Sequence, residues 1–150
     1  PLPQPAPTRS WSFPPPFGTQ QVVMVPLSEI VLISRHLPAQ TVNAWMTRKP
    51  LEDLADPSTS PPVAADADGR SAQRFVMQVR LRRQGSTRSA RAEGRDIYAV
   101  SAPLAVEALI RLLAHRVQPS GVLAVGQLFK GDDFLRALEP RHLQLTLNMP

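Results

Sequence analysis

The strongest structural signal in the chain is the segment RFVMQVRLRRQGSTRSARAEGR, residues 74–95. Apolar and polar residues alternate through its first half with the period of a β-strand. Gly85 can supply the positive φ of a tight turn, and small residues then recur on one side of the returning half. We therefore expect a long β-hairpin with one buried face and one arginine-rich face. The alternating residues are Phe75, Met77, Val79 and Leu81, then Ala90, Ala92 and Gly94.

The flanking segments predict further strands and helices. Residues 20–25, 41–48 and 142–149 have the pattern of strands, and 133–139 that of a helix capped by Asp132. Residues 30–33 are β-branched enough for a strand, but Ser28 and Glu29 favour a short helix there. A longer helix should begin with Ser101 as its cap and Pro103 in its first turn. This order predicts an α+β fold, a mostly antiparallel or mixed sheet with helices on one face.

Composition suggests how these elements are organised. Residues 1–19 are rich in proline and predict an irregular arm. We expect residues 20–150 to form a single α+β domain, interrupted by a flexible polar loop at about 49–71. The sequence shows no secretory signal, and we expect no membrane span, because no uninterrupted apolar run approaches the roughly 18 residues that one requires. A cytoplasmic location is the default expectation.

Several chemistries are excluded or disfavoured by the residues present. The chain has no cysteine, which rules out disulfides and thiolate chemistry. Its glycines form neither G-x-G-x-x-G nor a Walker loop, so no nucleotide cradle is predicted, and its three histidines have no partners at metal-ligand spacing. Eight arginines lie between Arg70 and Arg95 against one acid, Glu93. That charge could attract nucleic acid, but the arginine-rich face lacks interleaved aromatics for base stacking, which favours a solvated or partner-covered face.

The junction between the hairpin and the long helix carries the most suggestive polar residues. Arg95, Asp96 and Tyr98 all fall within GRDIYAVS, residues 94–101. They could orient a polar ligand, or Asp96 could pair with an arginine while Tyr98 packs at the edge of the core. The residues alone favour the structural role.

Four segments together resemble a known family. WSFPPPFGTQQVVMVPLSEIVLISRHL, DADGRSAQRFVMQVRLRR, GRDIYAVSAPLAVEALIRLL and GVLAVGQLFKGDDFLRAL follow one another from Trp11 to Leu138. They are similar to the C-terminal half of the bacterial saccharopine dehydrogenase-like NAD(P)-binding oxidoreductases. None of the four is a catalytic signature, so the resemblance assigns no catalytic acid or base.

The resemblance implies that cofactor and substrate are bound by different domains. The Rossmann cofactor domain of such an enzyme would precede this chain and bind NAD or NADP, while this chain would bind substrate and form a homodimer. We then expect the chain alone to bind no cofactor or metal and to be inactive, and to be a piece of a longer protein. Substrate contacts would come first from Arg95, Asp96 and Tyr98, and second from Arg35 and His36. The alternative is a stand-alone protein-interaction or scaffold module.

Overall fold

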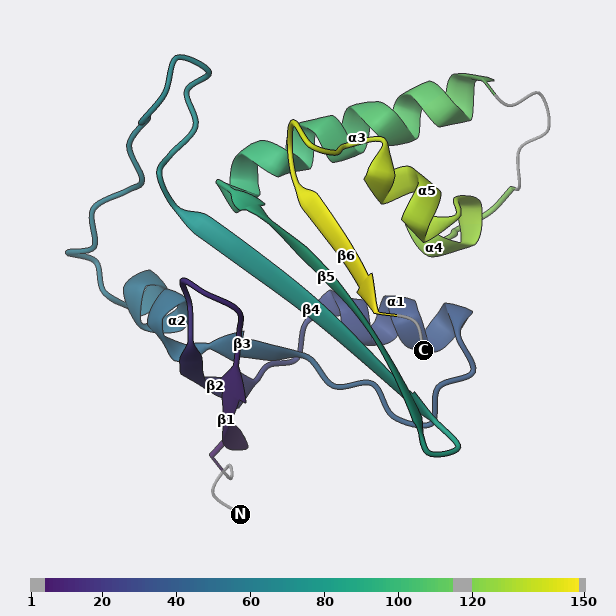
Figure 1. Cartoon of the computed structure of the whole chain (residues 1–150), viewed down its shortest axis with the longest axis horizontal. Coiled ribbons are helices and arrows are strands. Elements are labelled where there is room, and N and C mark those ends of the chain that lie inside the picture. The colour runs from purple at the N-terminus through teal and green to yellow at the C-terminus, as the bar shows by residue number, and fades with distance from the viewer. Residues whose placement is uncertain (1–4, 115–119, 149–150) are drawn as a thin grey trace. The chain divides into compact units, whose positions relative to one another are not determined.

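The computed structural model describes residues 5–114 and 120–148, and the fold is α+β as expected (Figure 1). The chain divides into two compact units, a first unit of Pro1–Pro61 and a second unit of Pro62–Pro150. Each unit contains one antiparallel three-stranded sheet, ordered β1-β2-β3 in the first and β4-β5-β6 in the second. This division between Pro61 and Pro62 differs from the single domain expected for residues 20–150.

The first unit contains β1 (Thr8–Ser12), β2 (Thr19–Met24), α1 (Ser28–His36), β3 (Trp45–Thr47) and α2 (Arg48–Ala55). β2 and α1 confirm the predicted strand and helix, whereas β3 is shorter than the predicted strand at 41–48. The irregular arm predicted for residues 1–19 was wrong in part, because β1 pairs with β2 from Thr8 to Ser12. The guanidinium of Arg9 lies over the rings of Trp11 and Trp45, 4.7 and 3.9 Å from their centroids, which ties the two edge strands together.

The predicted loop at 49–71 was also wrong over its first residues, which form α2. Two ion pairs at the i, i+4 spacing stabilise this helix, one between Arg48 and Glu52 at 3.4 Å and one between Lys49 and Asp53. Pro50 lies in the first turn, where its missing N–H removes no helical hydrogen bond. A helix held by surface charges leaves little apolar periodicity in the sequence, and the segment therefore resembled a loop.

The second unit is built on the predicted hairpin. β4 (Arg74–Arg83) and β5 (Ser86–Arg95) pair along their whole length, and β6 (Gln144–Asn148) adds to β5. Gln84 and Gly85 form the connecting turn with φ values of 47° and 82°, the two positive values that match the twist of a tight hairpin. In the part of this unit that the structure describes, three helices complete it: α3 (Ile97–Ala114), α4 (Val125–Leu128) and α5 (Gly131–Arg136).

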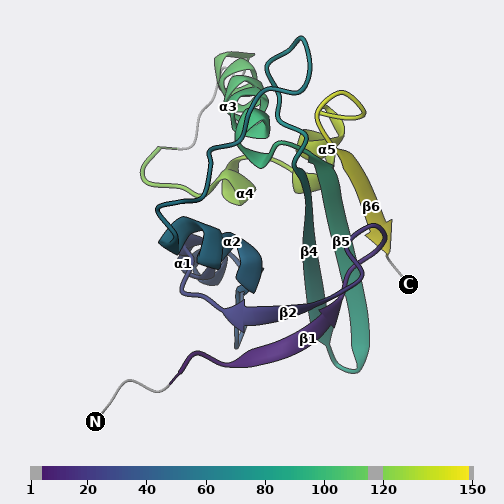
Figure 2. The same cartoon turned by 90° about the vertical axis from the view of Figure 1, so that its left-hand side faces the viewer.

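The core of the second unit lies where α3 and the segment after α5 meet one end of the sheet. It consists of Val100, Leu138 and Leu143, each 4 % exposed, with Phe75 and Leu145 of the sheet packed against them. Figures 1 and 2 show the turn of the hairpin extending away from α3 and α5. The predicted burial of one hairpin face is therefore only partly correct, because Met77, Val79 and Leu81 on that face remain 53–54 % exposed.

Candidate functional site

The predicted junction is a sharp turn from strand β5 into helix α3. Asp96 has a φ of 53°, a left-handed conformation that aspartate tolerates better than most residues. Its Oδ1 accepts a hydrogen bond from the backbone N–H of Ala99 at 3.0 Å, which caps the helix. The helix therefore begins at Ile97, and the expectation that Ser101 caps it was wrong; Pro103 lies inside the helix.

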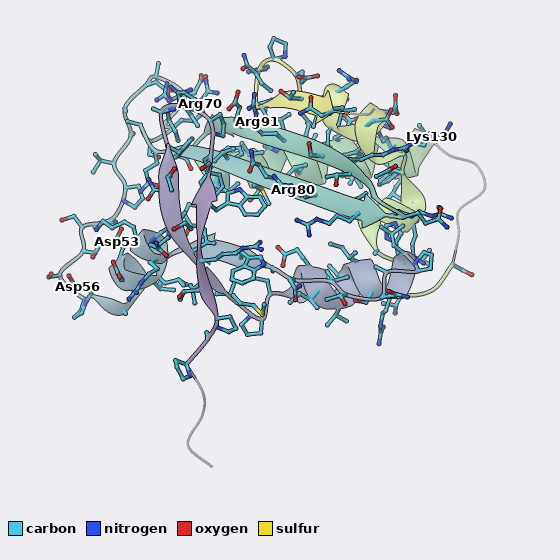
Figure 3. The ribbon with its side chains drawn as sticks, turned by 60° about the horizontal axis from the view of Figure 1, so that its bottom comes forward. Asp53, Asp56, Arg70, Arg80, Arg91 and Lys130 are labelled. Atoms are coloured by element: carbon cyan, nitrogen blue, oxygen red, sulfur yellow. The ribbon has the colours of Figure 1, made fainter. Side chains whose placement is uncertain are left out.

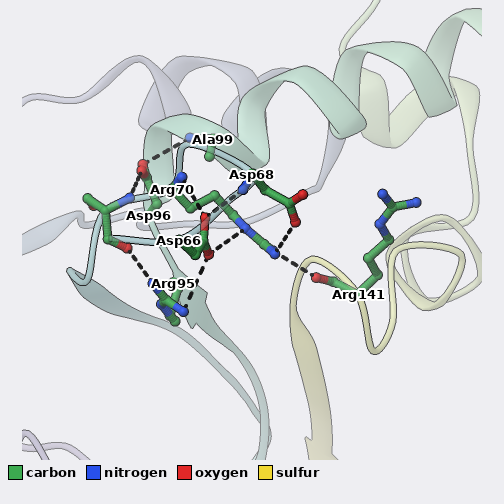
Figure 4. A network of polar contacts seen from close by, with 8 residues as sticks. Asp66, Asp68, Arg70, Arg95, Asp96, Ala99 and Arg141 are labelled. Atoms are coloured by element: carbon green, nitrogen blue, oxygen red, sulfur yellow. Dashed lines mark hydrogen bonds and ion pairs between the residues drawn. The ribbon is translucent and has the colours of Figure 1, made fainter. Parts of the chain in front are cut away.

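The other carboxylate oxygen of Asp96 holds a segment that is distant in sequence. Oδ2 accepts a hydrogen bond from the backbone N–H of Ser71 at 2.8 Å, and Arg95 Nη2 donates to the Ser71 carbonyl at 3.1 Å (Figure 4). Ser71 is only 4 % exposed. The bond from Ser71 and then the bond from Ala99 lower the pKa of Asp96 below its ordinary value. This carboxylate is thus an ionised anchor whose oxygens are engaged by backbone donors.

A second aspartate organises the loop that leads to Ser71. Asp66 Oδ1 accepts hydrogen bonds from the backbone N–H groups of Asp68 and Arg70 at 3.1 and 2.9 Å. Its Oδ2 lies 3.3 Å from Arg70 Nε and 3.5 Å from Arg95 Nη1. The backbone bond from Arg70 is the main cause of the lowered pKa of Asp66, and the charges of Arg70 and Arg95 add to it. Arg70 also donates to the Arg141 carbonyl at 3.3 Å, so the network joins three segments of the second unit.

This network differs from a reactive centre in its chemistry. A general base needs a carboxylate with an accessible oxygen and a pKa near the working pH. Asp66 and Asp96 instead have lowered pKa values. Their oxygens accept hydrogen bonds from backbone N–H groups, and Asp66 also forms ion pairs with guanidinium groups. Within residues 5–114 and 120–148, no three His, Cys, Asp or Glu side chains are grouped so that they could hold a metal ion. The network is suited to positioning the segment 64–71 against the strand-to-helix junction.

The five candidate residues do not form one cluster within either unit. Arg95 and Asp96 lie together, since both hold Ser71. Tyr98, the second residue of α3, is 76 % exposed and does not pack at the edge of the core. Arg35 and His36 end α1, which belongs to the first unit.

Sequence reasoning missed a charged pair on the buried side of α3, where Val100 and Leu104 pack in the core. Glu107 and Arg111 form a 2.6 Å ion pair there, and both side chains are 80 % buried. Arg111 also pairs with Asp133 of α5 and lies over the ring of Phe134, 5.2 Å from its centroid. Its two acidic partners raise its pKa, so the ion pair stays charged.

The opposite side of α3 is apolar and exposed. We call it the α3 outer face; its larger residues are Tyr98, Val106, Leu109, Ile110 and Leu113, which are between 54 and 78 % exposed. By length and composition alone, α3 could cross a membrane, with a mean hydropathy of 1.7 and 6 % of its residues buried. Glu107 and Arg111 interrupt the apolar residues of α3, so its length and composition do not test the expectation that the chain has no membrane span.

The sheet of the second unit adds a second exposed apolar surface and a polar one. Met77, Val79 and Leu81 form the apolar surface on β4. The opposite, arginine-bearing face includes Arg80 and Arg91, labelled in Figure 3. Arg91 there donates to Thr146 Oγ1 at 3.3 Å and lies 3.7 Å from Glu93 of its own strand.

Comparisons with family models, curated proteins and solved structures give no match to this chain. Assignment to the saccharopine dehydrogenase-like family therefore remains a prediction from the four quoted segments.

Proposed function

We propose that this chain is the substrate-binding and dimerisation domain of a saccharopine dehydrogenase-like NAD(P)-dependent oxidoreductase, and that it is inactive alone. The hydride chemistry would belong to NAD or NADP bound by a preceding Rossmann domain, while this chain would position substrate and exclude water. A cytoplasmic location belongs to the same proposal.

The observation that carries this proposal is the exposed apolar surface of α3. The helix packs Val100 and Leu104 in the core and buries an ion pair, yet it also leaves Leu109 and Leu113 exposed, which is unusual for a surface helix. Contiguous exposed apolar surface of this kind marks a contact with another protein or a membrane. The α3 outer face is therefore the surface where we place the cofactor-binding domain of the same enzyme.

Within this proposal the candidate residues take different roles. Tyr98 lies at one end of the α3 outer face and can offer its phenol to a substrate held between the two domains. Arg95 keeps a side chain that is 45 % exposed and can add a cationic contact. Asp96 acts as a positioning residue, because its carboxylate fixes the start of α3. Arg35 and His36 are the second pair of candidate contacts.

The test begins with the encoding gene upstream of Pro1. We expect an apolar strand followed by G-x-G-x-x-G within roughly 150 to 200 residues, the length of one domain. The upstream segment and this chain, co-expressed, should co-purify and bind NADPH, whereas this chain alone should bind none at micromolar concentration. Leu109→Asp should break the co-purification, and Leu54→Asp, at an 86 % exposed leucine on α2, should not.

Two results would contradict this proposal and select another function. An upstream region without a nucleotide-binding turn would favour the stand-alone interaction module, for which the exposed apolar surfaces are the supporting observation. Flotation of the purified chain with neutral phosphatidylcholine vesicles, abolished by Leu109→Asp, would identify α3 as a membrane-binding helix.

A further inference from the structure

The hairpin of the second unit ends in a ribbon of two strands. β6 pairs with β5 from Glu93 to Ser89, whereas β4 and β5 stay paired as far as their turn. In the part of the chain that the structure describes, residues 81–88 therefore extend beyond β6, and every one of them is exposed. We call residues 81–88 the hairpin tip. Figures 1 and 2 show it pointing away from α3 and α5.

The hairpin tip gathers positive charge that has no acidic neighbour. It contains Arg82, Arg83 and Arg88, and the nearest acid in the sequence is Glu93. Nearer the base of the hairpin, arginines form ion pairs with Glu93 and Asp66. Among the described residues, the three arginines of the tip have no such partner. The tip is therefore suited to an anionic ligand.

The three arginines lie on both faces of the ribbon. Residues directly opposite each other in antiparallel strands share a face, and successive residues of a strand alternate between faces. Arg82 therefore shares one face with Thr87, whereas Arg83 and Arg88 lie on the other. The tip thus carries guanidinium groups on its two sides and the amide of Gln84 at its turn.

We propose that the hairpin tip binds a DNA duplex by entering its major groove. That groove is about 12 Å wide and 8.5 Å deep, and it admits a two-stranded β-ribbon. Its depth corresponds to about two or three residues of a strand. The turn would then reach the base edges, while Arg82 and Arg83 would face the phosphates of the two backbones. This inference goes beyond the proposed function and uses a surface other than the α3 outer face.

The composition of the tip favours duplex DNA over other polyanions. Single strands bind largely by stacking of bases on aromatic side chains, and residues 76–96 contain none. The major groove of an RNA duplex is deep and narrow, so side chains do not read it. Binding at a lipid surface needs apolar residues beside the basic ones, and Leu81 is the only large apolar residue of the tip. A duplex groove instead requires arginines and polar donors, which the tip has.

Fluorescence anisotropy of a labelled DNA duplex of about two helical turns tests the inference with the purified full chain. We expect a Kd between about 1 and 100 μM at physiological salt, the range of binding without sequence preference. Three phosphate contacts predict that the affinity falls about 40-fold as the salt rises from about 50 to 200 mM. A single strand and an RNA duplex of the same length should bind at least about tenfold more weakly.

Two variants each remove three positive charges from exposed positions of the second unit. The tip variant combines Arg82→Gln, Arg83→Gln and Arg88→Gln. The control variant combines Arg74→Gln, Lys130→Gln and Arg141→Gln, which lie outside the tip. Both lower the formal net charge of +5 by three, so a difference between them reports position and not total charge. Circular dichroism checks that both variants fold.

We expect the tip variant to bind the duplex at least about tenfold more weakly at about 50 mM salt and to lose most of the salt dependence. The control variant should bind within about threefold of the unchanged chain, because screening limits charge effects at a distance. Equal losses in the two variants, or no binding at about 100 μM chain, would overturn the inference.

Two other results would also overturn it. Equal affinity for the DNA duplex, the single strand and the RNA duplex would show that the tip does not enter a groove. Flotation with phosphatidylserine vesicles that is lost in the tip variant, without binding to the DNA duplex, would assign the tip to a membrane surface. Co-purification with the upstream segment and NADPH binding test the proposed function separately.

Discussion

Replacement of Gly94 by alanine tests the packing of the second unit at one atom. Gly94 lies opposite Phe75 in the β4–β5 register. A Cβ at this position would meet the backbone carbonyl oxygen of His142 at 2.9 Å and two ring carbons of Phe75 at 3.0 Å. The carbonyl belongs to the backbone just before β6, so it cannot move aside as a flexible side chain could.

The size of the effect follows from two opposing contributions. Alanine restricts the unfolded chain more than glycine and favours the folded state by about 0.4 to 1 kcal/mol. Inserting a methyl group into a packed site disfavours it by about 1 to 3 kcal/mol. Contact with a fixed carbonyl places Gly94→Ala near the upper part of that range. We therefore expect a net loss of about 1 to 2 kcal/mol in the free energy of unfolding.

Urea unfolding followed by circular dichroism at 222 nm measures this loss. Trp11 and Trp45, the only two tryptophans, belong to the first unit. Their fluorescence therefore reports on the first unit and should be unaffected. Gly131→Ala is the matched control, because a Cβ at the first residue of α5 would meet nothing within 4 Å. Gly131→Ala should raise the stability by about 0.5 kcal/mol.

A neutral or stabilising Gly94→Ala would refute the reasoning, since it would mean that the backbone segment around His142, before β6, can shift without loss of stability. The double variant with Phe75→Leu locates the contact that matters. If the carbonyl of His142 dominates, removing the ring should leave most of the Gly94→Ala penalty in place.

Three further predictions concern the core, the polar network and α3. Leu138→Ala should lower the stability of the second unit by about 2 to 4 kcal/mol, whereas Leu113→Ala, at a 78 % exposed position, should change it by less than about 0.5 kcal/mol, both measured by urea unfolding. The pKa values of Asp66 and Asp96 are lowered in the folded state. The stability that these carboxylates contribute is therefore present above the unfolded pKa of about 3.9 and is lost as the pH falls through the folded values. Asp96→Asn should reduce the acid-induced fall in the urea midpoint, and an unchanged pH profile would contradict the anchoring role. Arg111→Met should lower the Tm more at low salt than at molar salt, because the lost ion pairs are screened by salt; equal losses would show that the arginine stabilises α3 by packing alone.

The hairpin was predictable because its signals are local. Alternation from Phe75 to Leu81 sets an extended backbone, and glycine at position 85 permits the positive φ of the turn. The polar character of the junction was also visible, since Arg95 and Asp96 stand between a strand pattern and a helical pattern. The α+β class follows from the order of these local segments.

The partners of these residues were not predictable, because they come from distant parts of the chain. Asp96 binds the backbone of Ser71, and Arg111 pairs with Asp133. Periodicity states that a helix has two sides, but it does not state which side the rest of the unit will cover. In α3 the ion-pair partner on α5 holds Arg111 on the same side as the core residues Val100 and Leu104, while Leu109 and Leu113 stay exposed.

Local backbone preference therefore established where the chain is extended, where it turns and where it is helical. The burial of each face depended on contacts between segments that are far apart in sequence. A strand such as β1, with little apolar alternation of its own, exists because β2 offers it hydrogen-bonding partners from Thr19 to Val23. Such pairing energy is absent from any short window of sequence and appears only when the segments meet.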